Sequence, residues 1–262
     1  MTEADRIRFK LIAHEVLMQE RVENGIGTLG EKRLHKILKR FLEENEENHE
    51  VKVGTYFADI LSGNMITEIQ TGSFRPLRDK ITYYLENTPY DITVVRPLPY
   101  VKTVCTVERE SGELLSRKKS PRRTRPRDVL RDWYYLAEFL SNPRFTLRFL
   151  LLEEDEYRMT KKKTRRWGKE SELYERIPTA LLDEELYESR SDYLKFLPED
   201  MPAEFSAAEY GKRAKLRGYS IYSALKILES VELVEKGEKQ GRSLLPSLHP
   251  PQVSRQFLHQ IV

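Results

Sequence analysis

The spacing of apolar residues predicts two amphipathic helices at the start of the chain, at residues 3–21 and 31–45. Apolar side chains recur there every three or four positions, which places them on one helix face. The first face comprises Ile7, Leu11, Ile12, Val16 and Leu17, and the second comprises Leu34, Ile37, Leu38, Phe41 and Leu42. Gly25, Gly27 and Gly30 separate the two helices, and an acidic stretch ends the second.

The pattern then changes to short segments typical of β-strands. Three strands are predicted at residues 51–53, 56–61 and 65–70, with a turn at Gly54 and a hairpin turn at Ser62-Gly63-Asn64. A helix at 74–87 follows, and then an apolar, β-branched strand at 91–95 that Pro97 and Pro99 are expected to close. Residues 102–108 and 113–115 suggest a further hairpin.

The order helix, three strands, helix, strand predicts an α/β fold with a mixed sheet. Consecutive strands joined by short turns form an antiparallel meander, whereas a strand that follows a crossover helix pairs in parallel. We therefore expect an αβββαβ core that ends near residue 126.

The remainder of the chain predicts a connector and a small terminal unit. A helix is expected at 127–141, a strand at 145–152, and a mixture of helix and loop at 165–200, whose aromatic residues are expected to fill a core. Helices at 206–216 and 220–230, a strand at 233–236, a turn at 237–241 and a strand at 242–245 are similar to a winged helix-turn-helix domain. The predicted units are residues 1–126, 127–203 and 204–262.

Composition limits the class of protein. The chain of 262 residues is 39% hydrophobic, which permits a sizeable core, and it has no apolar run long enough for a membrane helix. Its first ten residues lack the apolar segment of a signal peptide. Cys105 is the one cysteine, so no internal disulfide can form, and a reducing cytoplasm is expected.

The net charge of +3 conceals two segregated charged segments. Residues 43–50 hold five acids and no base, and residues 117–127 hold seven bases and no acid. A further basic run covers 161–166. Local basic segments are typical of nucleic-acid binding. Pro121 and Pro126 predict a loop for the longer run, and its candidate phosphate-binding residues are Arg117, Lys118, Lys119, Arg122, Arg123, Arg125 and Arg127.

Two carboxylates on adjacent predicted strands suggest a metal site. Asp59 lies in the second strand, while Glu68 and Gln70 lie two apart in the third and therefore face the same way. The hairpin would bring Glu68 back towards Asp59. Oxygen ligands suit Mg²⁺ (or Mn²⁺), and such a cation can polarise a phosphodiester.

The element order and the sequence Asp59…Glu68-Ile69-Gln70 resemble the PD-(D/E)XK nuclease superfamily over residues 28–100. The resemblance implies that Asp59 and Glu68 hold the metal and that the chain hydrolyses phosphodiester bonds of nucleic acid, with DNA as the expected substrate. Glu31 matches the acidic residue that many members carry in the first core helix. His35, one turn later, would face the same site. Many relatives act as dimers, so a homodimer is also implied.

Gln70 departs from the family pattern, which usually has lysine at this position. Some restriction enzymes of the superfamily are active with glutamine or glutamate there, and in other members the lysine comes from a neighbouring helix. Lys80, on the helix predicted at 74–87, is the candidate for that role.

Two alternatives remain open from the sequence. Gln70 and the winged-helix pattern also suit a protein that binds nucleic acid without cleaving it, as a regulator or a recognition subunit. The expected recognition helix at 220–230 has Lys226 as its one base, so the terminal unit alternatively serves protein interaction. Phosphate-binding loop, serine-hydrolase, zinc-protease and zinc-ribbon patterns are absent from the sequence.

Overall fold

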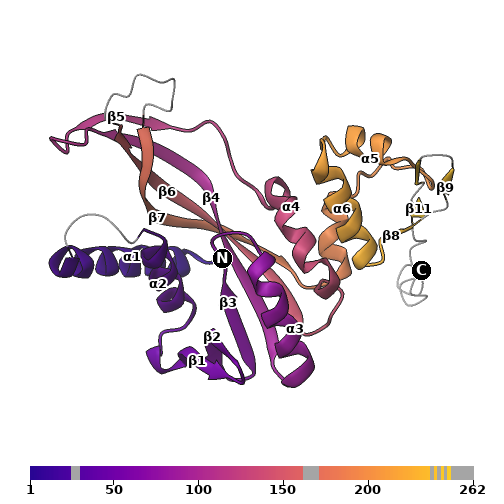
Figure 1. The fold of residues 1–262 in the computed structure, drawn as a ribbon, viewed down its shortest axis with the longest axis horizontal. Coiled ribbons are helices and arrows are strands. Elements are labelled where there is room, and N and C mark those ends of the chain that lie inside the picture. Colours follow the sequence, from indigo (N-terminus) through magenta and orange to yellow (C-terminus); the bar gives the residue numbers. More distant parts are fainter. Residues whose placement is uncertain (25–29, 162–170, 237–238, 241–242, 245–246, 249–262) are drawn as a thin grey trace, which may run out of the picture.

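The computed structural model describes residues 1–24, 30–161, 171–236, 239–240, 243–244 and 247–248. These residues form an α/β fold around an open, mixed sheet of seven strands, as the sequence predicts (Figure 1). The strand order is β1-β2-β3-β4-β6-β7, and β5 pairs with β4 beside this path. Among the described helices, none is long and apolar enough to cross a membrane.

Both amphipathic helices form where the apolar spacing places them. They are α1 (Glu3–Asn24) and α2 (Gly30–Leu42), followed by the 3₁₀ turn η1 (Glu46–Asn48). Phe9, Val16, Ile37 and Leu38 are fully buried, so the two helices share one core cluster. Ile7 and Leu11, which the spacing assigns to the first apolar face, are instead 53% and 60% exposed, because the buried side of α1 runs along Phe9, Ala13 and Val16. This cluster continues into the sheet through residues such as Leu150, which explains why both helices contact the sheet and one another.

The predicted meander and crossover are also present. The strands β1 (His49–Val53), β2 (Tyr56–Ser62) and β3 (Met65–Ile69) pair antiparallel in sequence. Next come the 3₁₀ turn η2 (Arg75–Leu77) and helix α3 (Arg78–Asn87), after which β4 (Asp91–Val107) pairs in parallel with β3. This connection places α3 beside the carboxyl end of β3.

The strand that Pro97 and Pro99 were expected to close instead continues to Val107, so that prediction is wrong. The Val95 carbonyl oxygen accepts the Gln70 amide, so Val95 directs its backbone polar groups toward β3. Residues 97 and 99 have the same orientation as Val95, but β3 has already ended at Ile69. Proline has no backbone N–H to donate. On this side of β4 no described strand lies beside residues 97 and 99, so no ladder hydrogen bond is lost and proline is tolerated.

The basic segment is only partly a loop, because residues 117–119 belong to strand β5 (Leu114–Lys119). This strand pairs antiparallel with the far end of β4, as the predicted hairpin required. The helix expected at 127–141 is a series of shorter helical pieces. These are η3 (Pro126–Val129), α4 (Leu130–Trp133) and η4 (Tyr134–Phe139).

The expected mixture of helix and loop at 165–200 is wrong for much of its length. Strand β6 (Phe145–Thr160) is twice as long as predicted, and β7 (Ser171–Tyr187) pairs antiparallel with it. A 3₁₀ segment, η5 (Arg190–Phe196), follows. Many residues are charged in the second half of β6 (residues 153–160) and in the first half of β7 (residues 171–178). The apolar alternation that identifies a strand is therefore missing there. The sheet therefore continues across residue 126, where the sequence places the end of the first unit.

The C-terminal region contains the two predicted helices, α5 (Ala207–Arg213) and α6 (Tyr219–Ser230). Ser206 caps α5 as expected, because its hydroxyl accepts the Glu209 amide at 3.1 Å. Strand β8 (Val234–Glu235) pairs with β11 (Ser247–Leu248), not with the predicted strand at 242–245. That predicted strand contains β10 (Ser243–Leu244), which pairs with β9 (Lys239–Gln240) inside the predicted turn.

The larger core cluster joins the sheet to the C-terminal helices. Trp133 is fully buried and stacks on Phe149 of β6 with ring centroids 4.8 Å apart. Tyr187, Tyr193 and Phe196 surround the same ring and confirm that aromatic residues of 165–200 fill a core. Tyr174 is only partly buried, and Trp167 lies outside the described residues. Cys105 is buried in β4, as expected for a small apolar side chain.

Candidate active site

A cavity of about 850 Å³ lies among α2, the strands β1–β3 and α3. Most of the catalytic and metal-binding residues predicted from the sequence line this cavity: His35, Asp59, Glu68, Gln70 and Lys80. They come from four elements and the loop after β3. The meander places Asp59 and Glu68 on neighbouring strands, while α2 and α3 bring His35 and Lys80 from two sides.

Asp59 is held in place by two hydrogen bonds to one carboxylate oxygen. Its Oδ2 accepts the Ile69 backbone amide at 2.7 Å and lies 3.2 Å from His35 Nε2. Burial alone would raise the pKa of Asp59, but the hydrogen bond and charge of His35, the Ile69 amide and Lys80 together lower it below its usual value. Asp59 is therefore ionised at neutral pH.

Glu68 is the most deeply buried acid of the cavity, with 1% of its side chain exposed. Its Oε2 accepts a hydrogen bond from Lys80 Nζ at 2.6 Å, whereas its Oε1 is buried without a hydrogen-bond partner among the described residues. Burial and the nearby Asp59 charge raise the pKa of Glu68 to about 7, against the opposing effect of Lys80. Glu68 thus exchanges a proton near neutral pH and offers an unused oxygen.

Lys80 is fixed between Glu68 and an aromatic ring. Its Nζ lies 5.9 Å from the ring centroid of Tyr84, a fully buried residue of the same helix. Burial and the Glu68 charge raise the pKa of Tyr84, so its hydroxyl stays neutral. The lysine that contacts Glu68 therefore comes from α3 and not from the strand position that Gln70 occupies.

Gln70 follows the last residue of β3 and is bound to the backbone. Its side-chain amide donates to the Ser73 carbonyl oxygen at 2.6 Å, which closes the loop between β3 and η2. Gln70 lines the cavity, and this bond uses one N–H of its side-chain amide. Glu31 lies in the first turn of α2, and its side chain falls outside the described residues.

Sequence reasoning missed Glu50, which lies beside His35 and Asp59. One donor atom from each of the three side chains lies within 4.8 Å of the others. Glu50 has a φ of 52°, in the left-handed region, and its Oε1 accepts from Lys39 Nζ at 2.5 Å. The acidic stretch 43–50 includes Glu50 and marks it as one of several candidate ligands. The strand pattern does not reveal that Glu50 has a positive φ, which sets the direction of its side chain.

Lys36, Lys39 and Arg40 of α2 also line the cavity, as does Lys80. The segment 117–127 does not. Arg117 pairs with Asp155 and Lys119 with Glu153, while Arg123 donates to the Ser120 carbonyl oxygen. Lys118 and Arg122 are exposed, and Arg125 and Arg127 line a different cavity. The structure therefore does not bring the seven predicted phosphate-binding residues together with Asp59 and Glu68.

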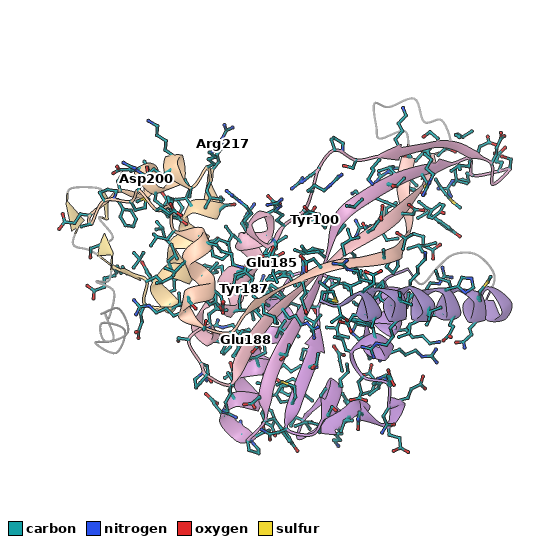
Figure 2. The ribbon with its side chains drawn as sticks, turned by 180° about the vertical axis from the view of Figure 1, so that it is seen from behind. Tyr100, Glu185, Tyr187, Glu188, Asp200 and Arg217 are labelled. Carbon is teal, nitrogen blue, oxygen red and sulfur yellow. The ribbon has the colours of Figure 1, made fainter. Side chains whose placement is uncertain are left out.

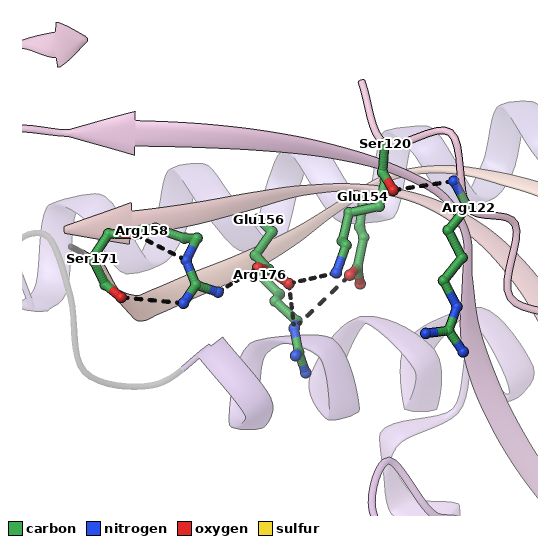
Figure 3. Close-up of polar contacts among 8 residues, drawn as sticks. Ser120, Arg122, Glu154, Glu156, Arg158, Ser171 and Arg176 are labelled. Carbon is green, nitrogen blue, oxygen red and sulfur yellow. Dashed lines mark hydrogen bonds and ion pairs between the residues drawn. The ribbon is translucent and has the colours of Figure 1, made fainter. Parts of the chain in front are cut away.

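A third group of charges, in the outer part of the sheet, is internally compensated (Figure 3). Glu156 is 4% exposed and accepts from Lys102 at 2.9 Å and from Arg158 at 2.8 Å. Arg176 lies 3.5 Å from the same carboxylate and 3.8 Å from Glu154. Buried charges are normally paired in this way, so this group has the character of a structural network.

Comparison with known proteins gives one match. Residues 32–188 match the model of a family described as "Domain of unknown function (DUF8091)". No curated protein and no solved structure matches the chain. The matched segment extends from α2 to the end of β7, so it includes the whole candidate site apart from Glu31 and also the outer strands. The match covers more than half of the residues of the chain, so the chain belongs to the DUF8091 family.

Proposed function

We propose that the chain is a metal-dependent nuclease that hydrolyses phosphodiester bonds, with DNA as its substrate. The observation that carries this proposal is the position of Asp59, Glu68 and Lys80 in one cavity, where Glu68 Oε1 is buried without a hydrogen bond within the normal distance to any described residue. The carboxylates stand on the second and third strands of a helix, three strands, helix, strand order. This arrangement supports the resemblance to PD-(D/E)XK nucleases.

The side chains present suit a divalent cation. His35, Glu50 and Asp59 offer one imidazole nitrogen and two carboxylate oxygens in close proximity. Carboxylates favour Mg²⁺ and Mn²⁺, and an imidazole is more compatible with Mn²⁺ than with Mg²⁺. When bound, such a cation lowers the pKa of a water molecule and offsets charge on a phosphate oxygen. We assign Asp59 as a ligand, with Glu68 Oε1 as the second carboxylate expected from the resemblance.

The remaining residues have separate roles in this proposal. Lys80 places its amino group against Glu68, a position for which the family pattern would use a lysine at residue 70. Glu68, with its pKa of about 7, can exchange a proton with a water molecule near neutral pH. Lys36 on α2 adds a cation to the cavity wall that suits a phosphate backbone, whereas Lys39 and Arg40 are paired there with Glu50 and Glu46.

The C-terminal helices form the second part of the proposal, a winged-helix-like unit. Ala224, Leu225, Ile227 and Leu228 bury one face of α6, while Tyr219 and Tyr222 are 73% and 64% exposed. Lys226 is the one base of α6, and it lies 3.7 Å from Glu229. The composition of this helix favours contact with a protein over contact with phosphates, as the sequence already suggested.

The proposal predicts that Asp59→Ala and Asp59→Asn abolish cleavage. Supercoiled plasmid DNA would be incubated with the purified chain and Mg²⁺ or Mn²⁺, and nicked product measured over time. Loss of a metal ligand should lower the rate roughly 100-fold or more. Asp79→Asn is the matched control, because Asp79 is exposed on α3 and does not line the cavity, and its rate should be unchanged.

Undiminished cleavage by both Asp59 variants would overturn the assignment. If the wild-type chain binds DNA in a saturable manner but leaves it uncut with either metal, the alternative of a binding protein without catalysis is correct. Circular dichroism of each variant would establish that the fold is retained.

A further inference from the structure

A second cavity, of about 410 Å³, lies between the end of β7, η3, η5 and the end of α5. In Figure 2, Tyr100 stands on the β4 side of this region and Asp200 on the α5 side, with Glu185 and Tyr187 between them. Its volume is within the range of small-molecule sites. The candidate active site shares no lining residue with it.

The charged lining of this cavity is strongly unbalanced. Five cations line it, and Glu185 is the one carboxylate among the lining residues; the cations are Arg125, Arg127, Lys195, Arg213 and Lys215. Lys195 pairs with Glu185 at 3.0 Å, and Arg213 pairs with Asp200 and Glu209 outside the lining. Two of the five cations are therefore neutralised within the protein.

The other three cations meet no carboxylate in the part of the chain that the structure describes. Arg125 donates to the Tyr100 hydroxyl at 3.4 Å, and Arg127 donates to the Ala214 carbonyl oxygen at 2.7 Å. Lys215 is exposed at the cavity rim. This differs from the network of Glu156 and Arg176, where each cation faces an acid. Uncompensated cations converging on a cavity favour an anionic ligand.

The other lining residues indicate which class of anion fits this cavity. Apolar side chains contribute to the walls, among them Pro126, Leu130, Pro198 and Leu216. Guanidinium groups match the geometry of phosphate oxygens, and a cavity of this size exceeds what inorganic phosphate needs. We infer that this cavity binds a nucleotide unit, with Arg125, Arg127 and Lys215 on its phosphate and the apolar wall against its base.

The unit can be a free nucleotide or part of a polynucleotide strand, and both present the same phosphate chemistry. The test uses the full chain in EDTA, so that no metal-dependent cleavage interferes. Fluorescence anisotropy would follow a fluorescently labelled adenosine monophosphate and, separately, a labelled single-stranded oligonucleotide. Saturation by the mononucleotide identifies the free ligand, and saturation by the oligonucleotide alone identifies a strand.

Two pairs of variants locate the binding. Arg125→Gln and Lys215→Glu should each raise the dissociation constant roughly tenfold or more, because the first removes an uncompensated positive charge and the second reverses one. Arg217→Gln and Lys212→Glu make the same charge changes at exposed positions nearby that do not line the cavity, and their dissociation constants should stay within about twofold of the wild-type value.

Two results would overturn the inference. One is the absence of saturable binding by either probe. The other is equal affinity across the two variants and their controls. Asp59→Asn separates this site from the proposed active site, since it should leave the affinity unchanged. If Asp59→Asn abolishes binding while Arg125→Gln does not, the probe occupies the first cavity and the second cavity is not a nucleotide site.

Discussion

Asp59 and Glu68 show how neighbouring strands give two carboxylates opposite properties. Asp59 accepts hydrogen bonds from a backbone amide and an imidazole, and its pKa falls. Glu68 is more deeply buried and feels the Asp59 charge, so its pKa rises despite Lys80. Divergent pKa values in one cavity are typical of sites that carry out proton transfer.

Glu68 should make the metal-free protein less stable as the pH rises. Its folded pKa is about 7, above the ordinary 4.5, so between these values the folded state binds more protons than the unfolded state. The free energy of unfolding should therefore fall through this window, by roughly 3 kcal/mol in total. Urea unfolding of the wild type and of Glu68→Gln in EDTA, from pH 4.5 to 7.5, measures the difference between them.

The Glu68→Gln variant serves as the reference, because it has no carboxyl group to titrate at this position. A stability difference between the two proteins that does not change with pH would contradict the assigned pKa.

Sequence patterns located part of the site because strand alternation and hairpin turns are local. Asp59, Glu68 and the following helix could be placed from spacing alone, whereas Lys80 was a candidate because the family resemblance allows a lysine from a neighbouring helix. Glu50 could not, because its backbone has positive φ and its neighbours in space come from α2 and β2. The bond from Gln70 to Ser73 likewise depends on a loop path that spacing does not describe.

At the scale of elements, the turn between β1 and β2 depends on Gly54. Its φ is 61°, and a Cβ atom at this position would lie 1.9 Å from the Tyr83 hydroxyl oxygen. The turn therefore lets α3 approach the meander closely. Gly63, in the next turn, has a φ of 58° but nothing within 4 Å of the added atom.

Gly54→Ala should consequently destabilise the protein more than Gly63→Ala. Both substitutions introduce left-handed strain of about 1–2 kcal/mol. Only Gly54→Ala adds a steric clash, which costs about 1–3 kcal/mol more. Urea unfolding of the two variants measures this difference, and equal losses of stability would show that Tyr83 moves aside without cost.

Long strands were harder to predict than helices. The strands β4, β6 and β7 each exceed fifteen residues, and the second half of β6 and the first half of β7 are rich in charged residues. Proline within β4 predicts the end of that strand from local sequence. The strand nevertheless continues, because the neighbouring β3 ends before the proline positions are reached. The partners of such strands lie far away in the sequence, so the local pattern could not reveal that the acids of β6 are buried beneath cations.

At the scale of the molecule, the larger core cluster links regions that the sequence suggests are separate. It includes Val53 of β1, Trp133 of α4 and Leu228 of α6. Tyr210 of α5 also donates to the Phe196 carbonyl oxygen at 2.8 Å in a buried position. The C-terminal helices are thus part of the same apolar interior as the sheet.

We therefore expect one cooperative thermal unfolding transition. Calorimetry would compare the calorimetric and van 't Hoff enthalpies, which should agree for a single unit. Trp133→Ala should lower the free energy of unfolding by about 3–5 kcal/mol and keep the transition single. Two resolved transitions, one of them unaffected by Trp133→Ala, would show instead that the C-terminal helices unfold independently.

Part of the basic segment lies in strand β5, which has an unpaired edge. It pairs with β4 on one side, and no described strand pairs with its other side. Leu114 and Leu115 are 52% and 53% exposed there, followed directly by Arg117, Lys118 and Lys119. An open strand with exposed leucines is a template for edge-to-edge association, and charged side chains oppose it. We therefore expect these three cations to disfavour extension of the sheet into a second molecule.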